Sequence, residues 1–83
     1  MRHGNLPKLK VRYDTEDERE ARTVEIEQAK DFYYGSIAGQ PLVTLEGQAV
    51  YSYRELFQLA TRDNYKDKEF LKVELRQIAL GGG

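Results

Sequence analysis

The chain has 83 residues, of which 13 are lysine or arginine and 14 are aspartate or glutamate. A chain of this length forms one domain with a thin core, and its near-neutral charge gives no general attraction to nucleic acid or to a membrane surface. It contains no cysteine, which excludes disulfides, thiolate metal sites and a cysteine nucleophile. We therefore expect a small binding or carrier domain and not an enzyme.

No run of apolar residues approaches the ~20 that span a bilayer, and no signal-peptide core is visible. We therefore expect a soluble, cytoplasmic protein.

Two segments near the amino terminus, residues 8–13 and 23–27, alternate between apolar and polar side chains. The apolar positions are Leu9, Val11 and Tyr13 in the first segment and Val24 and Ile26 in the second. Alternation with a period of two is typical of a half-buried strand. Residues 14–20 between them are rich in acids, so the sequence predicts a β-hairpin closed by a solvated acidic turn.

A short helix is expected after the hairpin. Residues 28–34 place Ala29, Phe32 and Tyr33 at the spacing of a helix face. Glycine is unfavourable inside a helix, so this helix should end near Gly35 or fray towards Gly39.

A second helix is signalled by a capping box. The Ser52 side chain can accept a hydrogen bond from the amide of Glu55, and the Glu55 side chain can reach back to the amide of Ser52. We expect the helix to run from residue 53 to about residue 62.

Two further strands are predicted at residues 42–45 and 71–75, the first followed by a turn at residues 46–48. The full order is then strand, strand, helix, strand, turn, short helix, strand. It favours an α+β domain in which a mixed sheet of four to five strands packs on one main helix plus a short helix. The last strand should lie centrally beside the first; parallel pairing there requires a crossover, which the intervening helices can supply.

The end of the last strand contains a change of phase. Ile78 and Leu80 share the parity of the charged strand positions and not that of the apolar ones. Either a bulge near Gln77 returns them to the edge of the core, or they are displayed as a docking patch for a partner protein. The sequence leaves both interpretations open.

The chain ends in Gly81-Gly82-Gly83. Three glycines have no side chains to fix a shape, and fully extended they span ~10 Å at roughly 3.3–3.6 Å per residue. Such a tail could pass along a narrow channel and present the Gly83 carboxylate to a remote active site, or it could be a loose end. We divide the chain into a domain at residues 1–80 and a flexible tail at residues 81–83.

From residue 42 onward the sequence resembles the β-grasp family of ubiquitin-like proteins. The nearer likeness is to the sulfur carriers of thiamine and molybdopterin biosynthesis and to related prokaryotic ubiquitin-like modifiers. Three segments carry it: residues 43–50 are similar to the family's strand and turn, residues 53–57 to its short helix, and residues 72–75 to its last strand before the glycines. The resemblance implies a single β-grasp domain with no catalytic residue, metal or cofactor of its own.

The resemblance also implies a function. A partner adenylating enzyme of the E1 type, with its ATP, would activate the Gly83 carboxylate for sulfur transfer or for conjugation to another protein. Gly81 and Gly82 would thread into that enzyme, and Ile78 and Leu80 would bind the partner. The alternative is a non-catalytic β-grasp interaction module with an inert tail.

Overall fold

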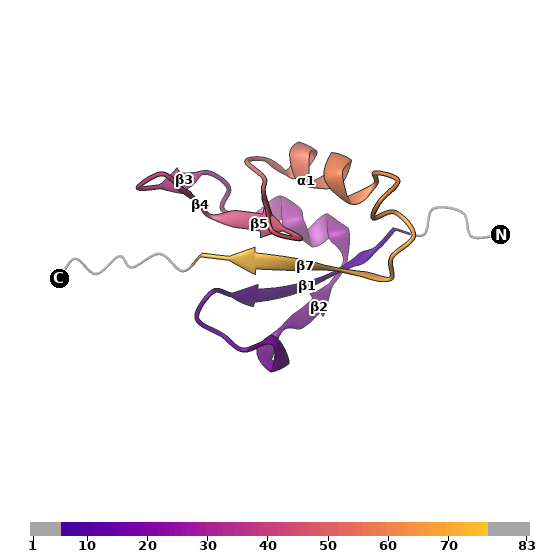
Figure 1. Ribbon diagram of the computed structural model, residues 1–83, viewed down its shortest axis with the longest axis horizontal. Helices are drawn as coiled ribbons and strands as arrows, with labels where there is room; N and C mark the ends of the chain where they lie inside the picture. The colour runs from indigo at the N-terminus through magenta and orange to yellow at the C-terminus, as the bar shows by residue number, and fades with distance from the viewer. Residues whose placement is uncertain (1–5, 77–83) are drawn as a thin grey trace.

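Five strands form one mixed sheet in the order β2-β1-β7-β5-β6 (Figure 1). The computed structural model describes residues 6–76. The sheet strands are β1 (Lys8–Tyr13), β2 (Arg22–Val24), β5 (Val43–Leu45), β6 (Gln48–Ala49) and β7 (Phe70–Leu75). A separate ribbon pairs β3 (Ser36–Ile37) with β4 (Gln40–Pro41), and the helical elements are η1 (Glu18–Glu20), η2 (Ile26–Asp31) and α1 (Tyr53–Ala60).

The centre of the sheet is the parallel pair of β1 and β7. Their register places Leu9 beside Leu71 and Val11 beside Val73. All four side chains are buried, as the alternating pattern predicts. A parallel pair needs a long crossover, and the chain between the two strands contains both η2 and α1. The prediction of a central last strand beside the first is confirmed, and the two strands pair in parallel.

Antiparallel strands flank this pair on both sides: β2 pairs with β1, β5 with β7, and β6 with β5. The turn between β5 and β6 has two residues with positive φ, Glu46 at 51° and Gly47 at 83°, which suits the right-handed twist of a hairpin. Two bonds hold Glu46 in this conformation. Its amide donates to the carbonyl of Lys72 at 2.8 Å, and its carboxylate accepts from the amide of Lys72 at 2.9 Å.

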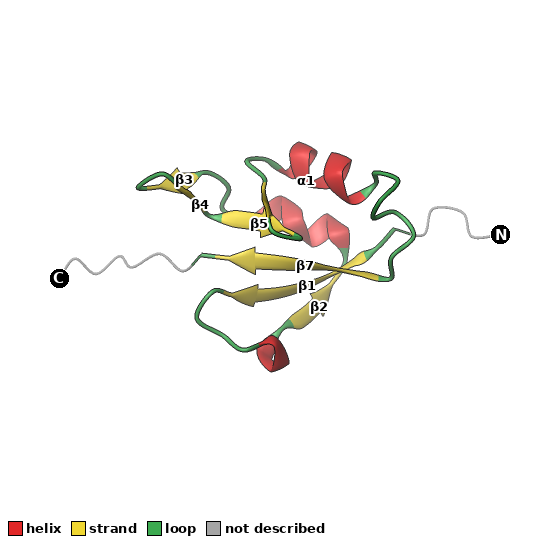
Figure 2. Cartoon of the chain, viewed as in Figure 1, coloured by secondary structure: helices red, strands yellow, loops and turns green. Residues whose placement is uncertain are grey.

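One face of the sheet is covered by α1 and η2 (Figure 2). The buried helix side chains are Leu56, Leu59 and Ala60 from α1 and Ile26 and Ala29 from η2. They join the inward side chains of β1, β5 and β7 in a single apolar cluster. The predicted α+β class, with a mixed sheet and one main helix, is therefore confirmed.

The start of α1 differs from the predicted capping box in one bond. Ser52 Oγ accepts from the amide of Glu55 at 3.1 Å, as expected. The Glu55 carboxylate, however, accepts from the amide of Tyr51 at 2.9 Å and not from that of Ser52. The helix ends at Ala60, before the predicted end near residue 62.

The prediction for the first helix is wrong in type and extent, because η2 is a six-residue 3₁₀ helix. A 3₁₀ helix has three residues per turn, so Ile26, Ala29 and Phe32 fall on one side of the chain. Ile26 and Ala29 are buried and Phe32 is half-buried, whereas Tyr33 is 79% exposed. The sequence therefore placed Tyr33 on the core face wrongly, and it placed Ile26 in a strand that ends at Val24.

The β3–β4 ribbon was not predicted. Its turn has positive φ at Ala38 (52°) and at Gly39 (78°), a two-residue hairpin turn of the kind that glycine favours. The ribbon lies at the end of the molecule toward which β1 and β7 point (Figure 1). The expected fraying of a helix toward Gly39 is thus replaced by a chain reversal.

We expect Ser52→Ala to lower the free energy of unfolding by about 1 kcal/mol, because it leaves the Glu55 amide without its cap. Urea unfolding measures the change. Ser36→Ala, which makes the same substitution at an exposed ribbon position, should leave stability unchanged. Equal losses in the two variants would contradict the assigned cap.

The phenol of Tyr34 ties the chain after η2 back onto that helix. Its hydroxyl donates to the carbonyl of Ala29 at 2.7 Å. Burial, with a smaller contribution from the nearby Tyr53, raises the pKa of Tyr34 from 10.0 to about 12. The folded chain therefore holds this proton more tightly than the unfolded chain does.

A pH dependence follows from this raised pKa. The contribution of Tyr34 to stability is complete below pH 10.0 and is lost as the pH rises towards about 12. In Tyr34→Phe, the free energy of unfolding should fall less steeply across this interval than in the wild type. Urea unfolding at a series of pH values tests this, with Tyr33→Phe as a control expected to follow the wild type.

Candidate functional site

The carboxyl end of β7 is a fixed point at the rim of the sheet. The amide of Asp14 donates to the carbonyl of Leu75 at 2.8 Å, and the amide of Arg76 donates to the carbonyl of Leu42 at 2.9 Å. The Arg76 guanidinium also donates to the carbonyl of Pro41 at 3.3 Å and pairs with Asp14 at 3.5 Å. The backbone is thus held from both sides, and the residue after Arg76 starts from a defined position.

A groove of about 560 Å³ opens beside this point, on the helix-covered face of the sheet. Its lining combines two sets of residues: the apolar or aromatic Val11, Tyr13, Val24, Phe32, Tyr33, Leu42 and Leu75, and the polar or charged Arg22, Gln28, Asp31 and Arg76. We call it the end groove. The inward positions are fully buried at Leu71 and Val73 but only half-buried at Leu75, so the core opens toward this end.

The short helix explains why the core opens here. A 3₁₀ helix of six residues spans about 12 Å, whereas a six-residue strand spans about 20 Å. The helix therefore cannot cover the full length of β1 and β7. Their last inward side chains, Tyr13 and Leu75, lie beside each other in register and form part of the end groove.

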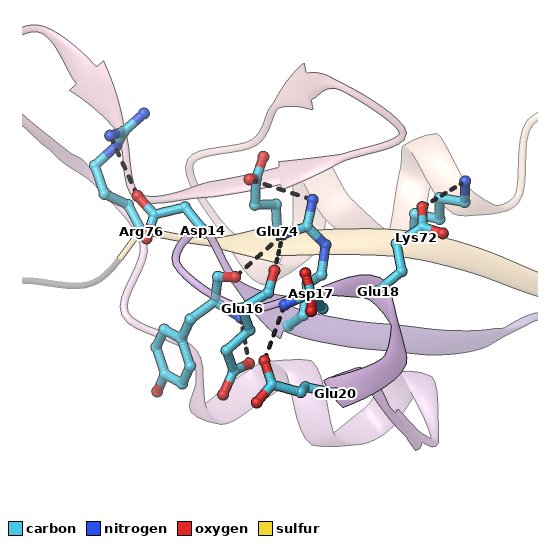
Figure 3. A network of polar contacts seen from close by, with 10 residues as sticks. Asp14, Glu16, Asp17, Glu18, Glu20, Lys72, Glu74 and Arg76 are labelled. Carbon is cyan, nitrogen blue, oxygen red and sulfur yellow. Dashed lines mark hydrogen bonds and ion pairs between the residues drawn. The ribbon is translucent and has the colours of Figure 1, made fainter.

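The opposite face of the sheet carries a network of polar contacts in which the acidic loop meets Lys72, Glu74 and Arg76 (Figure 3). Arg12 on β1 makes several of these contacts. Its guanidinium donates to the carbonyls of Glu16 at 2.7 Å and of Tyr13 at 3.2 Å. It also lies 3.7 Å from the carboxylate of Glu74 on β7. One side chain from the sheet therefore holds the backbone of the acidic loop.

Further contacts order the rest of that loop. The amide of Asp17 donates to the Glu20 carboxylate at 2.9 Å at the start of η1, and Lys72 on β7 pairs with Glu18 at 3.3 Å. The segment is exposed, as the predicted solvated turn requires, but it is anchored to the sheet and contains a helical turn.

A smaller hollow of about 290 Å³ lies between the acidic loop and the β5–β6 turn. Its charged lining mixes both signs: Lys10, Arg12, Lys72, Glu18, Glu46 and Glu74. Most of these groups already bind one another or the backbone, so the hollow presents no concentrated charge to a ligand. Across residues 6–76, no cluster of histidine, cysteine or acidic side chains could hold a metal ion, and no helix is long and apolar enough to cross a membrane.

The site residues predicted from the sequence all follow Arg76. Gly81, Gly82 and Gly83, together with Ile78 and Leu80, lie outside the described residues, so their predicted roles stay predictions. The sequence missed the end groove because its lining residues were read as ordinary core positions. The only local signal was the three-residue spacing of Ile26, Ala29 and Phe32, which is compatible with a 3₁₀ helix but does not reveal how much of the sheet that helix covers.

Comparisons with models of known families, with curated proteins and with solved structures find no match for this chain. Its function is therefore argued from its own topology and surface.

We expect Arg12→Ala to release the acidic loop. The substitution removes the hydrogen bonds that the charged Arg12 side chain donates to two carbonyls, and hydrogen bonds of this kind are worth about 1.5–3 kcal/mol. Cleavage by a glutamate-specific protease at residues 16–20 should therefore accelerate. Lys72→Ala is the matched control, since it removes one exposed ion pair worth at most about 1 kcal/mol. Equal protease sensitivity in the two variants would contradict the central role of Arg12.

Proposed function

We propose that this chain is a ubiquitin-like β-grasp carrier whose Gly83 carboxylate is activated by a partner adenylating enzyme. The observation that carries the proposal is the sheet order. The first and last long strands form a central parallel pair, β2 flanks it on one side and the β5–β6 hairpin on the other, and α1 and η2 lie on one face (Figure 2). This is the arrangement that the resemblance from residue 42 onward implies.

The position of β7 adds support. The strand β7 is central in the strand order, and its carboxyl end lies at the rim of the sheet, where Arg76 is held by hydrogen bonds. From there the sequence continues through residues 77–80 to the three glycines. A carboxylate carried on such a segment can enter an active site that the folded domain cannot enter. Glycine has no Cβ and suits passage along a narrow channel, which gives Gly81 and Gly82 their proposed role.

The chemistry takes place on the partner. An oxygen of the Gly83 carboxylate attacks the α-phosphorus of ATP, pyrophosphate leaves, and an acyl adenylate forms. In sulfur transfer, sulfide then attacks the acyl carbon, AMP leaves and a thiocarboxylate forms. In conjugation, a cysteine of the partner attacks the same carbon, AMP leaves, and the resulting thioester passes the acyl group to a lysine amine. The chain supplies the carboxylate and the docking surface, with Ile78 and Leu80 as proposed anchors for a cytoplasmic enzyme.

Four features depart from the sulfur carriers named above. Their first helix is longer than the six-residue η2 and has no interruption like Gly35, and their turn into the last strand contains glycine where residues 66–69 have none. They end in two glycines instead of three, and the acidic hairpin loop of this chain is longer than is typical of them. None of these departures changes the strand order. We therefore keep sulfur transfer and protein conjugation as two forms of one proposal, to be separated by experiment.

The test is to express the chain, tagged at its amino terminus and ending at Gly83, in its source organism and to measure its mass. A sulfur carrier should show one oxygen replaced by sulfur. A modifier should leave residues 77–83 attached to target lysines after trypsin digestion, because Arg76 is the last basic residue. Adding ATP and hydroxylamine to the lysate should trap the adenylate as a hydroxamate at Gly83.

Two variants control this experiment. Deletion of Gly81, Gly82 and Gly83 should abolish every product, and Gly82→Val should reduce product formation at least tenfold while leaving the fold unchanged. An unmodified carboxylate in cells, with no attached 77–83 remnant and no hydroxamate, would contradict the carrier and favour the interaction module with an inert tail.

A further inference from the structure

The end groove, which the described residues leave open, is lined by apolar and aromatic side chains together with the polar Arg22, Gln28, Asp31 and Arg76. Tyr13 and Leu75 form part of its lining and are half-buried, as are Val24 and Phe32. Its volume of about 560 Å³ falls within the roughly 300–1,000 Å³ typical of sites that enclose a small apolar ligand. Aliphatic side chains are the groups that the apolar part of such a lining would bind.

The segment that follows β7 begins at the rim of this groove. Leu75 and Arg76 both line it, and the Arg76 amide is bonded to Leu42, another lining residue. From there, residues 77–80 can reach about 13 Å when extended, at roughly 3.3–3.6 Å per residue. The two apolar side chains of that segment, Ile78 and Leu80, therefore come within reach of the groove.

The two faces of the sheet offer these side chains very different surroundings. A regular continuation of β7 would direct Ile78 and Leu80 to the outer face, beside Glu74, Arg76 and the anchored acidic loop. A one-residue irregularity at Gln77 would direct them to the inner face, where the end groove lies. Apolar side chains favour the second arrangement because it removes them from water.

We propose that the end groove is the binding surface for Ile78 and Leu80 of the same chain. Covalent attachment favours this occupant, since a segment on a short tether has an effective concentration in the millimolar range. A second copy or a separate partner peptide of similar composition must exceed that concentration to displace it.

The docked segment has a consequence that rests on the proposed function. Ile78 and Leu80 cannot contact the end groove and an adenylating enzyme at the same time. The groove and the enzyme therefore compete for the same two side chains, and the docked state limits how far Gly83 extends from the domain. A partner must draw the segment out before the carboxylate reaches ATP.

The direct test is NMR on the full chain labelled with ¹³C and ¹⁵N. Nuclear Overhauser contacts from the methyl groups of Ile78 and Leu80 to Val24, Phe32 and Leu75 are expected. Mixing labelled and unlabelled chains separates contacts within one chain from contacts between two. Contacts only between chains, contacts to the outer face, or no contacts at all would each overturn the proposal.

A variant pair gives a second measurement. Replacing both Ile78 and Leu80 by aspartate changes no residue of the folded core, and it should raise amide hydrogen exchange at Val24 and Phe32 about twofold. Deletion of residues 81–83 is the matched control and should leave those rates unchanged. Unchanged exchange in the aspartate variant would overturn the proposal. Neither measurement uses ATP or an enzyme, so failure here is distinct from failure of the proposed activation.

Discussion

The rest of this structure depends on the parallel pairing of β1 with β7, which are separated by most of the chain. Leu9, Val11, Leu71 and Val73 meet at its centre. Burying a side chain of this kind stabilises the fold by about 1.5–3 kcal/mol, so the pair supplies a large share of a thin core. Every other described element lies in the chain between these two strands: β2 pairs beside β1, β5 and β6 extend the sheet beyond β7, and α1 and η2 cover one face (Figure 2).

The same pairing shapes the candidate site. The register places Tyr13 beside Leu75, so β1 and β7 finish at the same edge of the sheet. The crossover begins with a helix too short to reach that edge. The parallel pairing of β1 with β7 therefore accounts both for the position of the end groove and for the edge of the sheet at which the chain leaves β7. On the opposite face, Arg12 and Lys72 anchor the acidic loop, so charge covers that face and apolar surface remains on the other.

The sequence predicts the strands and their pairing well because alternation and burial act over neighbouring residues. It fails where two short patterns compete: Ala29 and Phe32 fit both an α-helix and a 3₁₀ helix, and only packing on the sheet selects the second. It also fails where partners are distant, since nothing local joins Glu18 to Lys72. For residues after Arg76, the sequence supplies the chemical hypothesis, and the described structure adds the surface beside which that segment starts.

A simple balance of free energies explains how one short segment could have two binding surfaces. Burying Ile78 and Leu80 together contributes about 3–6 kcal/mol. Fixing the backbone of residues 77–80 costs about 4–8 kcal/mol. The two ranges overlap, so the docked and released states lie close in free energy. A partner that offers these side chains a slightly better surface can then extract them, whereas a deeper groove would hold the segment and withhold the carboxylate of Gly83.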